Sequence, residues 1–336
     1  MSNSVQPAPG SPGAGAVSSE RPGTIEAVPV RHPGRWVAIA VIAVLVAMFV
    51  HMVLTNPAFN WPFVFEAMIQ TPVLEGLLKG TILVTVLSML IGVSLGVVMA
   101  VMRLSDNPIL AGVAWLFTWF FRAVPRLVLL TIMGTLGILF KDGIALGVPF
   151  DRQIMDFIGL TGDLRFVTLD ANAIFGGLFG GALGLGVSEA AYMAEIARAG
   201  ILSVDPGQKQ AASALGMSNS QAMRRIVLPQ AMRVIVPPTG NETIAMVKDT
   251  SLLIGLPLIT EMFFQMQSIG SRTYQTFPVL VGATIWYLLI CSLLMLVQVQ
   301  LEKKFGKGFG AKPPTPNAYK AKMLKLRTAG GGMGGV

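Results

Sequence analysis

The sequence has 336 residues, of which 53% are hydrophobic and only 12% are charged. Soluble domains usually carry about twice that share of charged residues, so this composition indicates a polytopic membrane protein. Its long, unbroken apolar runs predict helices, because the strands of a membrane barrel are shorter and alternate. The net charge of +8 does not indicate nucleic-acid binding, since the basic residues cluster beside the apolar runs. One cysteine and two histidines favour neither a disulfide nor a metal site, and no cofactor is expected.

The apolar runs predict six membrane spans. Residues 1 to about 30 precede them and are rich in Pro, Gly, Ala and Ser, which predicts a disordered tail. The predicted spans lie at about 36–54, 80–102, 125–140, 172–195, 236–266 and 278–300. Arg122 and Pro125 interrupt the third apolar run, so residues 109–121 are predicted to form a separate helix at the membrane interface.

The distribution of lysine and arginine predicts the orientation of the spans. The loop at 141–171 has five acidic and three basic residues, whereas the loop at 196–235 has five basic residues and one acidic residue. Arg31 and Arg35 precede the first span, and residues 303–336 form a strongly basic tail. Because basic segments stay in the cytoplasm, both termini and the 196–235 loop are predicted to be cytoplasmic. The acidic loop is predicted to face outside.

The basic loop contains its own helix signals. Asp205 precedes a proline, as at the start of a helix, and Gly216 is typical of a left-handed helix end. Ser218 begins a capping box for a second helix, which Pro229 is expected to end or kink. The segment 205–229 is therefore predicted to be a hairpin of two short helices with narrow apolar faces. Such a hairpin either docks into a groove of a partner or rests on the membrane surface.

Ionisable residues lie within the predicted spans, where such groups usually face a cavity or a partner. Thr239 and Glu242 predict a capping box at the start of the fifth span, with Lys248 and Asp249 about two turns later. Glu189 lies alone in the fourth span. Two interpretations remain open: these groups contact a charged substrate, or they form structural ion pairs, such as Glu189 with Lys248.

Glycines recur at intervals of four residues, at Gly92 and Gly96 and again at Gly176, Gly180 and Gly184. This spacing lets helices approach closely. It predicts tight packing within the chain, with a subunit interface as the alternative.

Several motifs resemble those of the permeases of ABC importers. The spacing from Gln210 through Gly216 to Ile226, Leu228 and Pro229 is similar to the EAA loop of that family. The segments AAYMAEIARAGILSVDPGQKQAASALG and KDTSL resemble its polar amino acid branch. The segment LLKGTILVTVLSMLIGVSLGVVMAVMRLS resembles the first core helix of the same branch.

The resemblance covers about residues 76–302 and implies an all-α fold with the five-helix core of a type-I ABC importer permease. The hairpin at 205–229 is then the coupling segment of that core. The helix at 36–54 is an extra, N-terminal transmembrane helix. The sequence departs from the family at Gln210, where a glutamate is usual, which removes a charge from the docking surface.

The resemblance implies the permease subunit of an ATP-driven importer for polar amino acids in the bacterial inner membrane. In that family the permease has no ATPase site of its own and is not an enzyme. Its partners are a cytoplasmic ABC ATPase dimer, an extracytoplasmic amino-acid-binding protein, the lipid bilayer and a second permease, either another copy or a paralogue. An ion-coupled secondary transporter is the alternative, although the inverted repeat typical of such transporters is not found. A membrane enzyme would need a catalytic or metal cluster, which the scarcity of histidine and cysteine disfavours.

Two sets of residues are candidates for function. The resemblance implies contact with the ATPase for Gln210, Ala211, Ala212, Gly216, Ile226, Leu228 and Pro229. The candidate substrate path consists of Glu189, Tyr192, Lys248, Asp249, Thr250 and Ser251. No catalytic or metal-binding residue is predicted.

Overall fold

The computed structural model describes residues 33–141, 143–159, 164–256 and 258–305. The chain divides into two units, of which the first ends at Thr55. Within the first unit, helix α1 (Pro33–Thr55) is long and apolar enough to cross a membrane, as predicted for residues 36–54. Most of both predicted tails lies outside the described residues.

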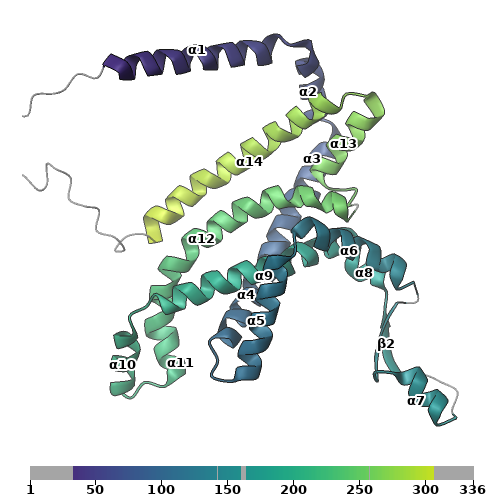
Figure 1. Ribbon diagram of the computed structural model, residues 1–336, viewed down its shortest axis with the longest axis vertical. Helices are drawn as coiled ribbons and strands as arrows, with labels where there is room; N and C mark the ends of the chain where they lie inside the picture. The colour runs from purple at the N-terminus through teal and green to yellow at the C-terminus, as the bar shows by residue number, and fades with distance from the viewer. Residues whose placement is uncertain (1–32, 142, 160–163, 257, 306–336) are drawn as a thin grey trace, which may run out of the picture. The chain divides into compact units, whose positions relative to one another are not determined.

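The second unit consists mainly of helices (Figure 1). In chain order they are α2 (Trp61–Met68), α3 (Thr71–Glu75), α4 (Leu83–Arg103), α5 (Pro108–Ala123), α6 (Arg126–Leu139), α7 (Asp151–Phe157), α8 (Ala171–Phe175), α9 (Gly177–Leu202), α10 (Pro206–Ala214), α11 (Asn219–Ala222), α12 (Leu228–Asp249), α13 (Met262–Thr273) and α14 (Thr276–Phe305). Short helical segments of other kinds are the 3-10 turn Pro57–Phe59, the π segments Gly76–Ile82 and Met223–Val227, and the 3-10 segment Thr250–Gly255. The all-α prediction is confirmed, with one antiparallel pair of short strands, β1 (Ile144–Gly147) and β2 (Arg165–Leu169), in the predicted acidic loop.

Three helical stretches among the described residues are long and apolar enough to cross a membrane: Gly34–Thr55, Thr71–Arg103 and Thr276–Phe305. A fourth is added if α5 and α6, which are bent by 100° at their junction, count as one span. Helix α9 is not among them, although it has 26 residues. More than half of its residues are buried by other helices, so it needs less apolar surface to lie in a membrane. The count of six spans therefore remains a prediction.

The predicted fifth span at 236–266 is wrong as one continuous helix. Helix α12 ends at Asp249, a 3-10 segment follows, and α13 begins only at Met262. The predicted capping box of Thr239 is also wrong, because this residue lies inside α12. Its hydroxyl donates to the Ile235 carbonyl at 2.8 Å, one turn earlier. The helix thus begins before the predicted start and breaks before the predicted end.

Helices α4 and α9 form the most extensive helix pair of the structure. A Cβ added at Gly96 would lie 2.6 Å from the Met193 Cβ, and one at Gly186 would lie 2.8 Å from the Ile91 Cβ. Real Cβ atoms do not approach so closely, so the glycines bring the two helix axes together. Of the predicted glycines, Gly92, Gly96 and Gly184 lie against other helices of the chain, which supports the first of the two interpretations at these three positions.

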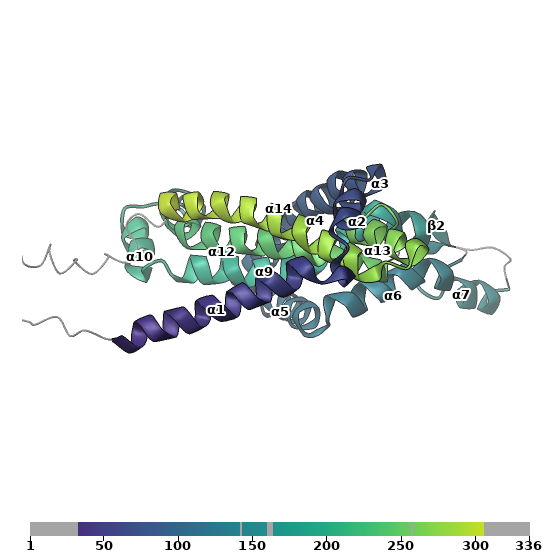
Figure 2. The same ribbon diagram turned by 90° about the horizontal axis from the view of Figure 1, so that it is seen from above.

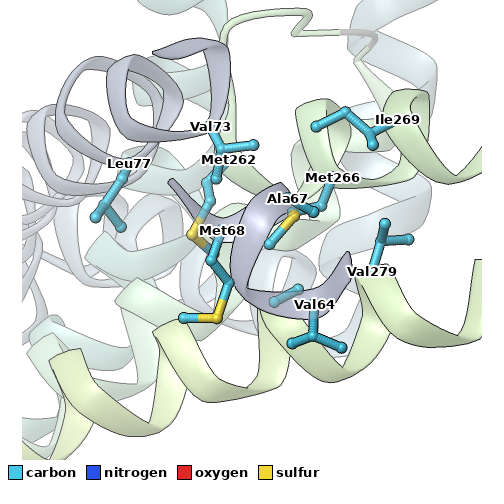
Figure 3. Close-up of a cluster of buried hydrophobic side chains, with 10 residues drawn as sticks. Val64, Ala67, Met68, Val73, Leu77, Met262, Met266, Ile269 and Val279 are labelled. Carbon is cyan, nitrogen blue, oxygen red and sulfur yellow. The ribbon is translucent and has the colours of Figure 1, made fainter. Parts of the chain in front are cut away.

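A cluster of buried side chains joins α2, α3, the π segment Gly76–Ile82, α13 and α14 (Figure 3). Its members include Val64, Ala67, Met68, Val73, Leu77, Met262, Met266, Ile269 and Val279. Helix α14 then runs beside α12 (Figures 1 and 2). The Gln298 side chain donates at 2.8 Å to the carbonyl of Pro237, which is one of two adjacent prolines within α12. These contacts hold α12 between the α4–α9 pair and α14.

Candidate functional site

The predicted hairpin begins with the capping bonds that the sequence indicates. The Asp205 carboxylate accepts a hydrogen bond from the Gly207 N–H at 2.7 Å, which satisfies a free donor of the first turn of α10. The capping box of the second arm is also present. The Ser218 N–H donates to the Gln221 side chain at 3.0 Å, and the Gln221 N–H donates to the Ser218 hydroxyl at 3.3 Å.

A left-handed glycine separates the two arms of the hairpin. Gly216 has a φ of +76°, and its N–H donates to the Ser213 carbonyl at 3.0 Å. The Met217 N–H reaches back to the Ala212 carbonyl at 3.1 Å. These two bonds form a Schellman motif, which aims the second arm away from the axis of the first. The predicted turn at Gly216 is therefore confirmed.

The side of α10 that faces away from the second arm is exposed. Gln210, Ala211 and Leu215 are exposed there, and Leu215 retains 82% of its accessible surface. Ala212 is only 3% exposed, on the side where α10 contacts the second arm. Ala212 is therefore a packing residue of the hairpin, which corrects the prediction that it lies on the presented face. Ala211 and Leu215 are the residues that a partner can reach.

The second arm does not end at Pro229, which corrects the first of the two alternatives expected for this proline. Helix α11, the π segment Met223–Val227 and α12 follow one another without a break, and Pro229 lies in the first turn of α12. The π segment changes the hydrogen-bond spacing just before the proline, which has no N–H to donate. Ile226 and Leu228 are half-buried and Pro229 is exposed. The hairpin is thus rigidly continuous with a long helix of the bundle.

At the other end of α12, an arginine that the sequence analysis did not select joins two acidic candidates. Arg126, the first residue of α6, donates from Nη2 to the Glu189 carboxylate at 2.7 Å and from Nη1 to the Asp249 carboxylate. The three residues form the ion cluster Arg126–Glu189–Asp249, which connects α6, α9 and α12. An arginine fork suits this role, because its two nitrogens can serve two carboxylates at once.

Glu189 is the fully buried member of the ion cluster. A Cβ added at Gly92 would lie 2.7 Å from the Glu189 Cγ, so the glycine provides the space for this side chain. One carboxylate oxygen, Oε1, has no hydrogen-bond partner among the described residues. A buried carboxylate with an unfilled acceptor is costly, and such groups usually serve a function.

Lys248 does not belong to the ion cluster. Its side chain is exposed and forms no ion pair with the described residues. The predicted alternative pair of Glu189 with Lys248 is therefore wrong, because Arg126 occupies the place beside Glu189. Asp249 keeps 29% of its side-chain surface exposed. Lys248 and Asp249 thus offer a free ammonium group and a partly accessible carboxylate as neighbours in the chain.

Tyr192, another candidate, lies one turn beyond Glu189 and is flanked by two arginines. The Arg126 Cζ lies 4.8 Å from the centre of its ring, and the Arg122 Cζ lies 5.7 Å from it. These distances fit cation–π contacts. The ring also lines an open pocket of about 460 Å³ together with Trp115 and Glu195. Tyr192 therefore lies between the ion cluster and this open pocket.

A second buried carboxylate, Glu261, was also missed by the sequence analysis. It caps α13 by accepting from the Phe264 N–H at 3.1 Å, and it accepts from the Thr81 hydroxyl at 2.9 Å and the Tyr287 hydroxyl at 3.3 Å. The candidate Thr250 is buried, and its hydroxyl donates to the Val247 carbonyl at 2.8 Å and lies 3.5 Å from the same carboxylate. The candidate Ser251 instead donates to the Lys248 carbonyl at 2.7 Å. Thr250 is thus placed to support the helix break.

A signal for both missed residues is present in the sequence. Arg126 and Glu261 are ionisable residues inside predicted spans, and such residues rarely lack a partner or a cavity. Arg126 is not predicted as a site residue because it lies at the edge of a predicted span. Glu261 is not predicted as a site residue because the apolar pattern predicts one unbroken helix over 236–266.

The sequence matches one protein family and is similar to individual known proteins. Residues 92–307 match the family described as binding-protein-dependent transport system inner membrane component. The arginine transport system permease protein ArgU of Corynebacterium glutamicum is 44% identical over 87% of this chain and 86% of that protein. The probable amino-acid permease protein YxeN of Bacillus subtilis is 32% identical over 63% of this chain and 82% of that protein.

A solved structure shares the fold as well as part of the sequence. It is an amino acid ABC transporter with histidines, which matches with a TM-score of 0.52 and 26% identity over 76% of this chain and 98% of that chain. The resemblance of the motifs to ABC importer permeases is thereby confirmed. The chain belongs to the family of binding-protein-dependent transport system inner membrane components.

Proposed function

We propose that the chain is the membrane-spanning permease subunit of an ATP-driven importer for polar amino acids. It forms the translocation path and couples this path to a separate cytoplasmic ATPase, since the sequence has no phosphate-binding loop of its own. An extracytoplasmic binding protein delivers the amino acid, and a second permease completes the path. The observation that carries the proposal is the capped hairpin in a chain of this family, with an exposed outer face and a rigid connection to α12.

The continuity of the second arm with α12 supports the coupling role. A displacement of the hairpin by the ATPase moves the π segment and α12 as one stretch, because no loop lies between them. Helix α12 carries Lys248 and Asp249 at its far end. Movement of the hairpin at the ATPase is thus transmitted to the ion cluster along α12, because this helix connects the two without a break.

The proposed substrate path passes Lys248 and Asp249. A free amino acid has an α-carboxylate and an α-ammonium group, which fit the ammonium of Lys248 and the partly exposed carboxylate of Asp249. Glu189 stays paired with Arg126, so it orients the guanidinium that holds Asp249. Tyr192 and the polar pocket beside it continue the path beyond the ion cluster.

Arginine is the proposed substrate. The 44% identical relative is an arginine transport permease, and its similarity extends over most of both chains. In proteoliposomes with the cognate binding protein and the ATPase, labelled arginine is expected to accumulate only when ATP is supplied on the ATPase side. Unlabelled lysine, glutamine and glutamate serve as competitors that define the side-chain preference. Uptake that an ion gradient drives without ATP would establish the secondary transporter instead.

Cross-linking tests the docking of the hairpin. With Cys291 replaced by alanine, Ala211→Cys is expected to form a disulfide with a cysteine placed in the ATPase groove, because Ala211 is exposed. Ala212→Cys is the matched control, one residue away but buried in the hairpin, and is expected to react far less. The absence of any cross-link from Ala211 and Leu215 in an intact complex would reject the docking model.

Reporter fusions test the proposed orientation, in which both termini are cytoplasmic. A reporter that is active only outside the cytoplasm is expected to be silent when fused after residue 336. The same reporter inserted at Asp156, in the acidic loop between β1 and β2, is expected to be active. The opposite pair of results would show that the number of spans is odd or that the orientation is inverted.

A further inference from the structure

A large apolar cavity lies away from the ion cluster, towards the end of the bundle that carries the hairpin. It has a volume of about 670 Å³ and is bounded by α4, α9, the π segment Met223–Val227, α12 and the last turns of α14. Val97 and Val101 of α4 face it from one side, and Met232 and Val236 of α12 from the other. Among the residues that the structure describes, none that lines it is ionisable. The cavity is therefore suited to hydrocarbon.

The lining makes the cavity a poor place for the proposed cargo. An amino acid carries two charges, and moving them into an apolar space without partners is costly. The polar groups that the described residues contribute to the wall are hydroxyls, including those of Ser105 and Thr239, and backbone. The charged candidates Glu189, Lys248 and Asp249 do not line the cavity. A ligand of this cavity must instead bring a long apolar part.

Cations follow directly after lining residues at the hairpin end of the cavity. Two of these basic residues directly follow Met223, one directly follows Met232, and two lie within a turn of Leu301. Met223, Met232 and Leu301 all line the cavity. These five exposed cations are Arg224, Arg225, Arg233, Lys303 and Lys304. None forms an ion pair within the part of the chain that the structure describes. An apolar slot between membrane helices with unpaired cations at one end complements an anionic phospholipid. The slot matches the apolar acyl chain, and the cations match the negatively charged headgroup.

We propose that this cavity binds one acyl chain of an anionic phospholipid from the membrane leaflet on the hairpin side. The phosphate of its headgroup is held by Arg224, Arg233 and Lys303. The lipid would then contact the α4–α9 pair on one side and α12 with its π segment on the other. These are the two parts that must shift relative to each other if the hairpin drives α12. Occupancy of the site is therefore expected to set how readily the ATPase cycle moves the permease.

Native mass spectrometry of the intact transporter, extracted from membranes that contain phosphatidylglycerol, tests the apolar part of the site. The wild-type complex is expected to retain phosphatidylglycerol, and Val97→Phe, which fills the cavity, is expected to weaken retention about tenfold, equivalent to about 1.4 kcal/mol. Val86→Phe is the matched control. It is also a valine of α4, with 50% exposure against 48% for Val97, but it does not line the cavity.

Exchange into nanodiscs tests the headgroup part of the site. Phosphatidylglycerol is expected to be retained in preference to phosphatidylcholine, and Arg224→Gln with Lys303→Gln is expected to abolish that preference. Lys141→Gln, an exposed cation just after α6 that does not line the cavity, is the control for general loss of charge. Co-purification of the ATPase confirms that each variant is assembled.

Three results would overturn the proposal. The first is a wild-type complex without bound lipid, or with equal retention of both lipids. The second is equal retention by Val97→Phe and Val86→Phe. The third is a Val97→Phe variant that keeps its lipid but no longer transports amino acid, which would place the cavity on the transport route. Failure of arginine uptake by the wild type would instead count against the proposed function and leave the lipid measurement intact.

Discussion

Arg126→Met is expected to prevent normal assembly of the transporter. The substitution leaves the buried Glu189 carboxylate without its counter-ion and removes the link from α6 to Asp249. Breaking a buried ion pair by removing one partner costs about 3–5 kcal/mol, because a charge remains in an apolar environment. The expected result is a strong loss of complex in the membrane and a lower melting temperature in detergent.

A double variant separates the structural role of the ion cluster from a role in transport. Arg126→Met combined with Glu189→Gln removes the uncompensated charge, so assembly is expected to recover in part. If assembly recovers and uptake, normalised to the amount of complex, does not, the ion cluster also serves transport. Arg198→Met is the matched control, because the Arg198–Glu195 pair is intrahelical and part-exposed. A loss of assembly no greater than that of Arg198→Met would show that the ion cluster is not structurally important.

Gly92→Val is expected to destabilise the α4–α9 pair and to displace Glu189. The new Cβ would lie 2.7 Å from the Glu189 Cγ, 2.9 Å from its Cβ and 3.3 Å from the Gly186 carbonyl oxygen. Glu189 cannot swing aside freely, because Arg126 holds its carboxylate. Overpacking of a tight core costs about 1–3 kcal/mol, and the strained ion pair adds to that loss. The expected readout is a lower melting temperature together with impaired uptake.

A glycine of α5 provides the control for this substitution. Gly112 is exposed, and a Cβ placed there would meet nothing within 4 Å. Gly112→Val is therefore expected to leave assembly, melting temperature and uptake close to those of the wild type. Equal behaviour of Gly92→Val and Gly112→Val would mean that α4 and α9 do not pack as closely as the structure shows.

The ion cluster lies where two irregularities of the helices meet. Helix α6 starts at Arg126 after a 100° bend from α5, α12 ends at Asp249, and a 3-10 segment follows it. Helix ends carry unsatisfied backbone groups, and in a membrane such groups must face protein or a water-filled space. The charged groups and the helix ends therefore share one polar region inside the bundle, as expected for a path that admits a charged amino acid.

The sequence by itself determined the features that depend on local chemistry. The caps at Asp205 and Ser218 and the left-handed turn at Gly216 use bonds between residues at most five positions apart, so composition and spacing specify them. The apolar runs likewise determined the helical class, because a lipid environment requires the backbone to satisfy its own hydrogen bonds. The order of the motifs along the chain is enough to identify the family.

The tertiary structure decided what depends on packing between distant segments. The partner of Glu189 is Arg126, 63 positions away, and no local signal distinguishes it from Lys248. The irregular stretch after Asp249 ends where Glu261 caps α13, and the further partners of Glu261, Thr81 and Tyr287, come from other helical segments. Ala212 and Ala211 are chemically identical in the sequence, and only the packing of the second arm against α10 buries one and exposes the other. Long-range partners follow from helix packing, which local periodicity does not encode.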